Sequence, residues 1–180
     1  IVMRARSPNR PGLLARFRRD AHGAAALEFA MVALPFFSLM LAIFETTAVF
    51  FANSTLENAV HDAARQIRTG QVQTGNVSAA QFTNLICAKI TPLLACDSNL
   101  SVDVRSFPNF AAVNFPQPLD ATGNFQIVPT FSPGAAGDIV LVRAFYTWHV
   151  VTPLIGVTLA NMPGNKHLIS SAVAFRNEPF

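Results

Sequence analysis

Residues 23–52 read GAAALEFAMVALPFFSLMLAIFETTAVFFA, the long apolar stretch of this 180-residue chain. Glu28 and Glu45 are its only charged residues, and the sixteen residues between them carry no charge. With its flanks, the stretch exceeds the ~20 residues that a helix needs to span ~30 Å of hydrocarbon. A signal-peptide core is shorter, at ~7–15 residues. The sequence therefore predicts a retained membrane-spanning helix over residues 24–52.

The positive charge of the chain is concentrated before this stretch. Residues 1–22 carry a net charge of +5, whereas the remaining residues carry −2. Arginines directly before an apolar span favour a cytoplasmic N-terminus. Residues 1–23 are therefore interpreted as a basic cytoplasmic leader and not as a nucleic-acid-binding element, and residues 53–180 as an extracytoplasmic domain. The arginines of the leader are Arg4, Arg6, Arg10, Arg16, Arg18 and Arg19.

The helix that enters the membrane is expected to continue beyond it. Residues 56–70, LENAVHDAARQIRTG, place apolar side chains at steps of three and four, which indicates one apolar helical stripe. Gly70 supplies a helix stop. One helix from Ala24 to Arg68 would be about 68 Å long at 1.5 Å per residue. Pro35 lies inside the span, and it predicts a kink near Leu34, because a membrane helix tolerates proline by bending.

The remaining chain alternates between helical and strand patterns. Ser78 and Gln81 have the spacing of a capping box, which predicts a second helix over residues 79–90. Strands are predicted over residues 100–107, 139–151 and 168–176, with a weaker fourth over residues 125–128. The first alternates apolar and polar residues, which is typical of a half-buried strand. Residues 108–137 are rich in Pro, Gly and Asn and indicate a loop. The fold class is therefore α+β, with the helices packed on a small antiparallel sheet.

Cys87 and Cys96 are the only cysteines of the chain. Both fall on the non-cytoplasmic side of the predicted span, where disulfides persist. A bridge would close a loop of about ten residues and stabilise the domain by roughly 2.7 kcal/mol in the chain-entropy description. The alternative is a pair of buried free thiols. No second pair of ligands accompanies the two cysteines, so a metal site is not predicted.

Catalytic patterns are missing from the sequence. The four histidines, His22, His61, His149 and His167, have no metal-ligand spacing. Ser170 and Ser171 lie in a predicted strand without a nucleophile turn around them, and no glycine-rich loop suits a phosphate. A non-enzymatic protein without cofactor, metal or small-molecule substrate is therefore expected.

Glu28 is the first candidate for a functional residue. An acidic side chain inside a membrane span is costly, so such residues are functional candidates by default. The alternative is that Glu28 extends to the cytoplasmic headgroups. Glu28 follows Gly23 by five residues and is followed by Phe29, and basic residues precede the group.

This arrangement resembles a known family. GAAALEF, residues 23–29, looks like the processing site of type IV prepilins, in the G-x4-E-[FY] form of the Flp/Tad (tight adherence) pilus system. The resemblance to TadE-like pseudopilins continues to the end of the chain. The segments that carry it are EFAMVALPFF (28–37), LENAVHDAARQIRTG (56–70), CAKI (87–90), LLACD (93–97), DIVLVRAFYTWHVVTPLIG (138–156) and RNEPF (176–180).

The resemblance implies that prepilin peptidase, a membrane aspartic protease, cuts between Gly23 and Ala24. The new α-amino group of Ala24 could then pair with Glu28 of a neighbouring subunit and set the register between helices. Ala26 and Ala30 form a small-xxx-small pair that allows close helix approach, although such pairs also arise by chance in an Ala-rich span. Glu45 is expected to reach the outer interface, where it needs no functional explanation.

The resulting hypothesis is a minor pilin or pseudopilin that assists assembly or initiation of a Flp/Tad-type pilus. Its expected partners are prepilin peptidase, other pilins, the assembly platform and the bilayer. Its expected location is the bacterial inner membrane, with a periplasmic C-terminal domain and a possible place in the pilus. The alternatives are an extracytoplasmic binding or catalytic domain on an uncleaved signal anchor, and a secreted protein cleaved near Ala52.

Overall fold

The computed structural model describes residues 22–91, 94–96, 98–152 and 159–180. The arginines of the leader lie outside these residues, as do residues 153–156 of the segment 138–156 quoted above. The chain divides into two compact units, residues 1–40 and 41–180. The sheet and the shorter helices all belong to the second unit, which is described below.

The first element is the long helix α2, His22–Arg68, with Pro35 inside it. Within the second unit, one face of this helix forms part of the core. Its buried side chains recur at steps of three and four, as predicted, because this spacing places them on one side of a helix with 3.6 residues per turn. These side chains are Val49, Ala52, Leu56, Ala59, Val60, Ala63, Ala64 and Ile67.

Two shorter helices follow, α3 (Gln71–Thr74) and α4 (Ala79–Ile90). The α4 segment coincides with the predicted second helix. The Ser78 side chain accepts a hydrogen bond from the Gln81 backbone, and the Gln81 side chain accepts one from the Ser78 backbone, which completes the capping box. Phe82, Ile86 and Ile90 recur every four residues and are fully buried.

Three antiparallel strands, β1 (Leu100–Phe107), β2 (Ile139–His149) and β3 (Lys166–Arg176), form one sheet in the order β1-β2-β3. The central strand β2 is the most apolar of the three and is buried along most of its length. Together with the helices, this sheet confirms the predicted α+β class.

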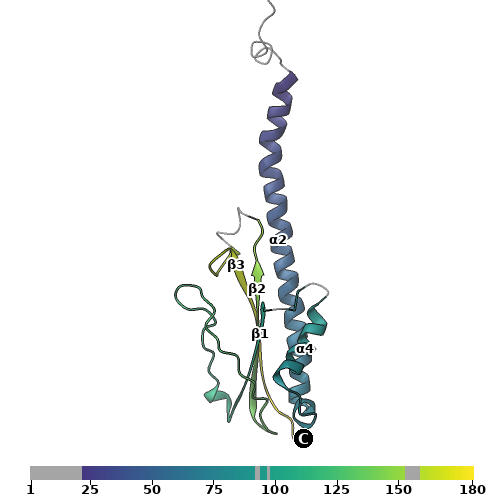
Figure 1. The fold of residues 1–180 in the computed structure, drawn as a ribbon, viewed down its shortest axis with the longest axis vertical. Helices are drawn as coiled ribbons and strands as arrows, with labels where there is room; N and C mark the ends of the chain where they lie inside the picture. Colours follow the sequence, from purple (N-terminus) through teal and green to yellow (C-terminus); the bar gives the residue numbers. More distant parts are fainter. Residues whose placement is uncertain (1–21, 92–93, 97, 153–158) are drawn as a thin grey trace, which may run out of the picture. The chain divides into compact units, whose positions relative to one another are not determined.

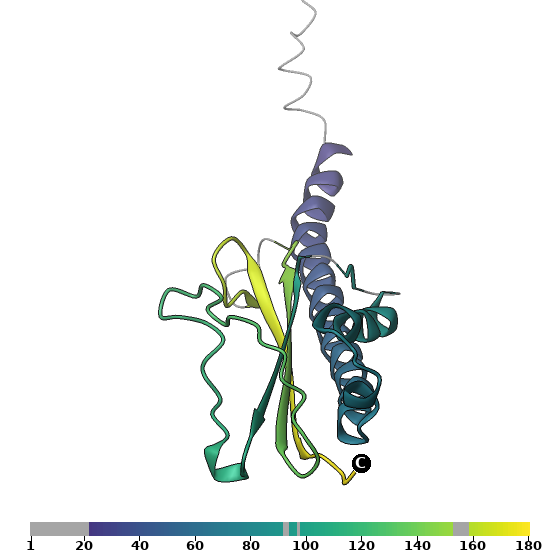
Figure 2. The ribbon, with the colours of Figure 1, turned by 60° about the horizontal axis from the view of Figure 1, so that its bottom comes forward.

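Each face of the sheet has its own cover (Figures 1 and 2). On one face, α2 and α4 pack against alternate residues of β2, including Val140, Val142 and Ala144. On the other face, the segment between β1 and β2 lies over the sheet, and Ile127 packs against Phe145. This segment is a loop, as predicted, apart from the short helix η1 (Phe110–Ala112).

Two predictions about the sheet are wrong. Residues 125–128 form no strand of the sheet; Phe125 makes only an isolated bridge to Leu119. The prolines at 116, 118 and 129 lack the N–H groups that a ladder needs, which limits regular pairing in this segment. The alternation in β1 also suggested a half-buried strand, yet Asp103 on its polar face is fully buried beneath the loop.

Candidate membrane anchor and processing site

The predicted processing residues all lie in the first two turns of α2. Gly23, Ala24, Glu28 and Phe29 are exposed, and nothing lies within 4 Å of the position that a Cβ on Gly23 would occupy. Because residues four apart share a face of a helix, Ala24 and Glu28 lie on the same side. Ala26 and Ala30 are likewise exposed and share a second side. The geometry leaves this end of the helix accessible to other proteins.

The following turns of α2 have the character of a membrane span. From Gly23 to Phe44 no side chain is buried, although most of these residues are apolar. In the part of the chain that the structure describes, this is the one helix long and apolar enough to cross a bilayer. Such a surface would be unfavourable in water and is suited to lipid. A single-pass membrane protein fits these observations.

Pro35 lies within this exposed part of α2, and the helix continues through it. Ser38 donates its hydroxyl to the Leu34 carbonyl at 2.8 Å, one turn along the helix. Hydroxyl bonds of this kind accompany bends in membrane helices. The kink itself stays a prediction.

Glu45 has a position that the sequence interpretation missed. Its carboxylate accepts hydrogen bonds from the backbone N–H groups of Val151 and Thr152, each at 2.6 Å. The side chain is buried, and the Trp148 indole lies in its neighbourhood. The sequence interpretation gave Glu45 no specific contact, whereas the structure gives it a structural role. No local pattern could have revealed these contacts, because the partners are backbone groups more than 100 residues away.

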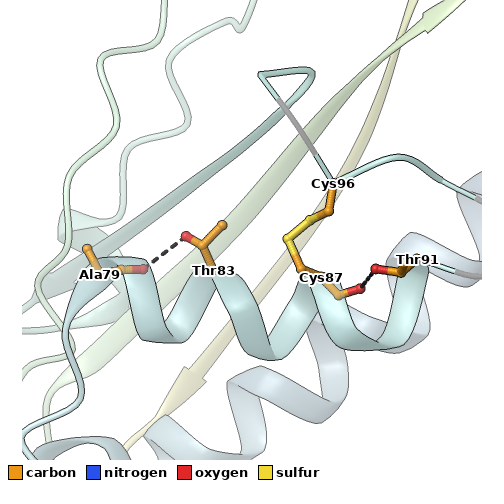
Figure 3. The surroundings of a disulfide bond; sticks show 5 residues. All are labelled: Ala79, Thr83, Cys87, Thr91 and Cys96. Atoms are coloured by element: carbon orange, nitrogen blue, oxygen red, sulfur yellow. Dashed lines mark hydrogen bonds between the residues drawn. A yellow bond between two sulfur atoms is a disulfide. The ribbon is translucent and has the colours of Figure 1, made fainter.

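Cys87 and Cys96 form a disulfide, with 5.5 Å between their Cα atoms (Figure 3). The bond joins the last turn of α4 to the segment that leads into β1. Thr83 in α4 and Thr91 at its C-cap lie on either side of Cys87, and each donates its hydroxyl to a backbone carbonyl of the preceding turn. Of the two alternatives left by the sequence, the structure has the bridge and not two free thiols.

A buried ion pair lies on the loop-covered face of the sheet. Asp103 accepts hydrogen bonds from the Arg143 and Arg105 guanidinium groups and from the backbone and hydroxyl of Thr130. Burial raises the pKa of Asp103, but these hydrogen bonds outweigh it and hold the pKa below its ordinary value of 3.8. A lone arginine within the apolar run of β2 was the sequence signal for this pair, because arginine is rarely buried without a partner.

The histidines lie along α2, at the end of β2 and in β3. His61 lies on the exposed face of α2, and His149 ends β2. The His167 ring donates its Nδ1–H to the Leu159 carbonyl at 2.6 Å. Among the described residues, no group of three or more His, Cys, Asp and Glu side chains could hold a metal ion.

Together, the exposed apolar helix and the covered sheet fit a single-pass membrane protein with an α+β domain, in the part of the chain that the structure describes. Residues 23–65 match the family model of TadE-like protein, which begins at the glycine of the GAAALEF motif. The match is consistent with a TadE-like protein of the Tad pilus system. No curated protein and no solved structure matches the chain.

Proposed function

We propose that this chain is a minor pilin or pseudopilin of a Flp/Tad-type pilus, processed by prepilin peptidase after Gly23. The observation that carries the proposal is the position of the family match. It begins at Gly23 and covers both the exposed apolar part of α2 and all of its buried stripe except Ile67. The same helix thus offers a surface for other membrane helices and a support for the α+β domain.

The proposed role is structural and not enzymatic. The protein is placed in the bacterial inner membrane with its leader in the cytoplasm and its domain in the periplasm. Its proposed partners are prepilin peptidase, other pilins and the assembly platform. Within this setting it primes the growing fibre or enters it.

Glu28 has a specific part in this proposal. Cleavage after Gly23 creates an α-amino group on Ala24, with an ordinary pKa of ~7.7–8.0. A carboxylate in lipid needs a partner of opposite charge. The amino group of one subunit and Glu28 of the next would satisfy each other and set the register between helices, with Ala26 and Ala30 allowing close approach.

The first test is the N-terminus of the protein extracted from membranes of cells with and without prepilin peptidase. Intact mass and N-terminal sequencing should give Ala24 as the first residue only when the peptidase is present. Gly23→Val should block cleavage, because the branched side chain obstructs the position that only hydrogen occupies in the native residue. An uncleaved leader in the presence of the peptidase would favour a domain on a simple signal anchor.

The second test concerns Glu28. Glu28→Gln keeps the shape of the side chain but removes its charge, so it should reduce co-purification with other pilins after cleavage. Glu57→Gln is the matched control, since Glu57 lies on the exposed face of the same helix. Equal co-purification of both variants would remove the register role from Glu28.

A further inference from the structure

The residues that follow β2 are bonded to α2 through one carboxylate. Glu45 Oε1 accepts the Val151 N–H and Oε2 accepts the Thr152 N–H. Two charge-assisted hydrogen bonds to one carboxylate set both the position and the direction of the bonded segment. Val150, directly before these residues, is buried. The strand end is therefore held at a defined height on the helix.

The position of Glu45 along α2 coincides with the expected outer edge of the bilayer. Glu45 follows Gly23 by 22 residues, which is about 33 Å of helix at 1.5 Å per residue. The hydrocarbon core of a bilayer is ~30 Å thick. Burial of α2 side chains also begins at Glu45. This placement rests on the membrane span of the proposed function.

The surface near Glu45 suits contact with lipid. Val151 is 82% exposed, and Phe44, beside Glu45 on α2, is 64% exposed. At the same end of the sheet, Lys166 pairs with His149 in the register of β2 and β3. A lysine beside apolar side chains is the combination that favours a lipid surface, because it attracts phosphate headgroups while the apolar groups enter the acyl boundary.

We propose that this end of the domain, formed by Phe44, Val151 and Lys166, rests on the outer surface of the bilayer. Its partner is glycerophospholipid, through apolar contact with acyl chains and ionic contact with the headgroup phosphate. Glu45 is the positioning residue that holds Val151 at this surface. The domain thus adjoins the membrane directly, at the point where α2 leaves it.

The test uses the full chain with Val151→Cys, labelled with a polarity-sensitive fluorophore and reconstituted into phosphatidylethanolamine/phosphatidylglycerol vesicles. The native cysteines are joined in a disulfide, so unsubstituted protein should remain unlabelled. Nitroxide-labelled lipid should quench the Val151 label several-fold more than a label at Ala136. Ala136 is exposed just before β2, whose eleven residues separate it from the Val151 end by about 37 Å.

A label at Phe37, inside the proposed span, reports on the anchor itself. Quenching at Phe37 with none at Val151 would overturn the lipid contact and leave the anchor in place. Absence of quenching at both positions would overturn the contact and the membrane span together. These outcomes separate failure of this inference from failure of the proposed function.

The positioning role of Glu45 is tested by comparing Glu45→Ala with Glu57→Ala. Glu45→Ala in the Val151→Cys protein should lower quenching at Val151 towards the Ala136 level, while quenching at Phe37 stays unchanged. Glu57→Ala, on the exposed face of α2, should leave both signals unchanged. Undiminished quenching in the Glu45→Ala protein would overturn the positioning role.

Discussion

Asp103 Oδ2 lies 2.7 Å from Arg143 Nη2, and both side chains are almost completely removed from solvent. The two residues are register partners on the adjacent strands β1 and β2. Arg143 also donates to the Pro116 carbonyl at 3.0 Å, and Thr130 donates to Asp103. The pair therefore joins two strands to two distant points of the loop that covers them.

Removal of one partner of this pair should destabilise the outer domain strongly. Asp103→Ala leaves the Arg143 charge buried without its partner, a change that costs about 3–5 kcal/mol in other proteins. Asp62→Ala is the control, because Asp62 pairs with Lys89 at 3.2 Å on the surface, with both side chains more than 60% exposed. It should change the free energy of unfolding by less than about 1 kcal/mol.

Denaturant unfolding in detergent, followed by the fluorescence of the single tryptophan, Trp148, measures both changes. Trp148 packs against the core, so its emission should respond to loss of the domain. Similar losses for Asp103→Ala and Asp62→Ala would contradict the importance of the buried pair.

The Asp103 carboxylate should make the stability of the domain depend on pH. The pKa of Asp103 is lower in the folded protein than its ordinary value of 3.8, so the folded state favours the ionised form. The resulting stability is fully present above pH 3.8 and is lost as the pH falls through the lower folded pKa. Unfolding measured at decreasing pH should therefore show a steeper loss below about pH 4 for the native protein than for Asp103→Asn.

Asp120 provides the comparison for this pH dependence. The Thr122 hydroxyl, which donates to Asp120 at 2.7 Å, contributes most to holding the pKa of this exposed carboxyl below 3.8. Because Asp120 is exposed, Asp120→Asn should alter the pH profile less than Asp103→Asn does. A larger change for Asp120→Asn than for Asp103→Asn would assign the acid sensitivity to the loop and not to the buried pair.

Gly70 should tolerate substitution less well than Gly164, although both have a left-handed backbone, with φ of 77° and 76°. A Cβ on Gly70 would overlap the Phe180 ring, whereas a Cβ on Gly164 meets nothing within 4 Å. Gly164→Ala should cost about 1–2 kcal/mol from backbone strain alone. Gly70→Ala should cost more, as measured by thermal unfolding.

A second substitution separates the cost of backbone strain at Gly70 from the cost of overlap with the Phe180 ring. Phe180→Ala removes the overlapping ring, so it should lower the additional cost of Gly70→Ala towards the value at Gly164. Strictly additive losses in the double variant would show that the ring and the glycine do not interact.

The disulfide should stabilise the domain by roughly 2.7 kcal/mol, the chain-entropy value for a loop of about ten residues. Replacing Cys87 and Cys96 together by serine should lower the free energy of unfolding by about this amount. Reductant should destabilise the native protein similarly and leave the double variant unaffected. An equal response of both proteins to reductant would mean that the bridge contributes nothing.

The helical part of this structure could be predicted because its signals are local. The stripe from Leu56 to Ile67 repeats at the helical period, and Ser78 with Gln81 encodes a helix start within four residues. The alternation in β1 and the apolar run of β2 likewise identify strands from neighbouring residues. The candidate processing motif is also local, since Gly23, Glu28 and Phe29 lie within seven residues. For the helices and strands the sequence alone was sufficient, and the processing motif stays a prediction.

The tertiary structure decided which polar residues are buried and what they bind. Glu45 is an ordinary helical glutamate in sequence, and only folding brings the N–H groups of Val151 and Thr152 to it. Asp103 has the alternation of a surface residue, and only the loop that crosses the sheet buries it against Arg143. Local periodicity specifies which face a side chain occupies. What covers that face depends on contacts between residues far apart in the chain, and these form only when the whole domain is assembled.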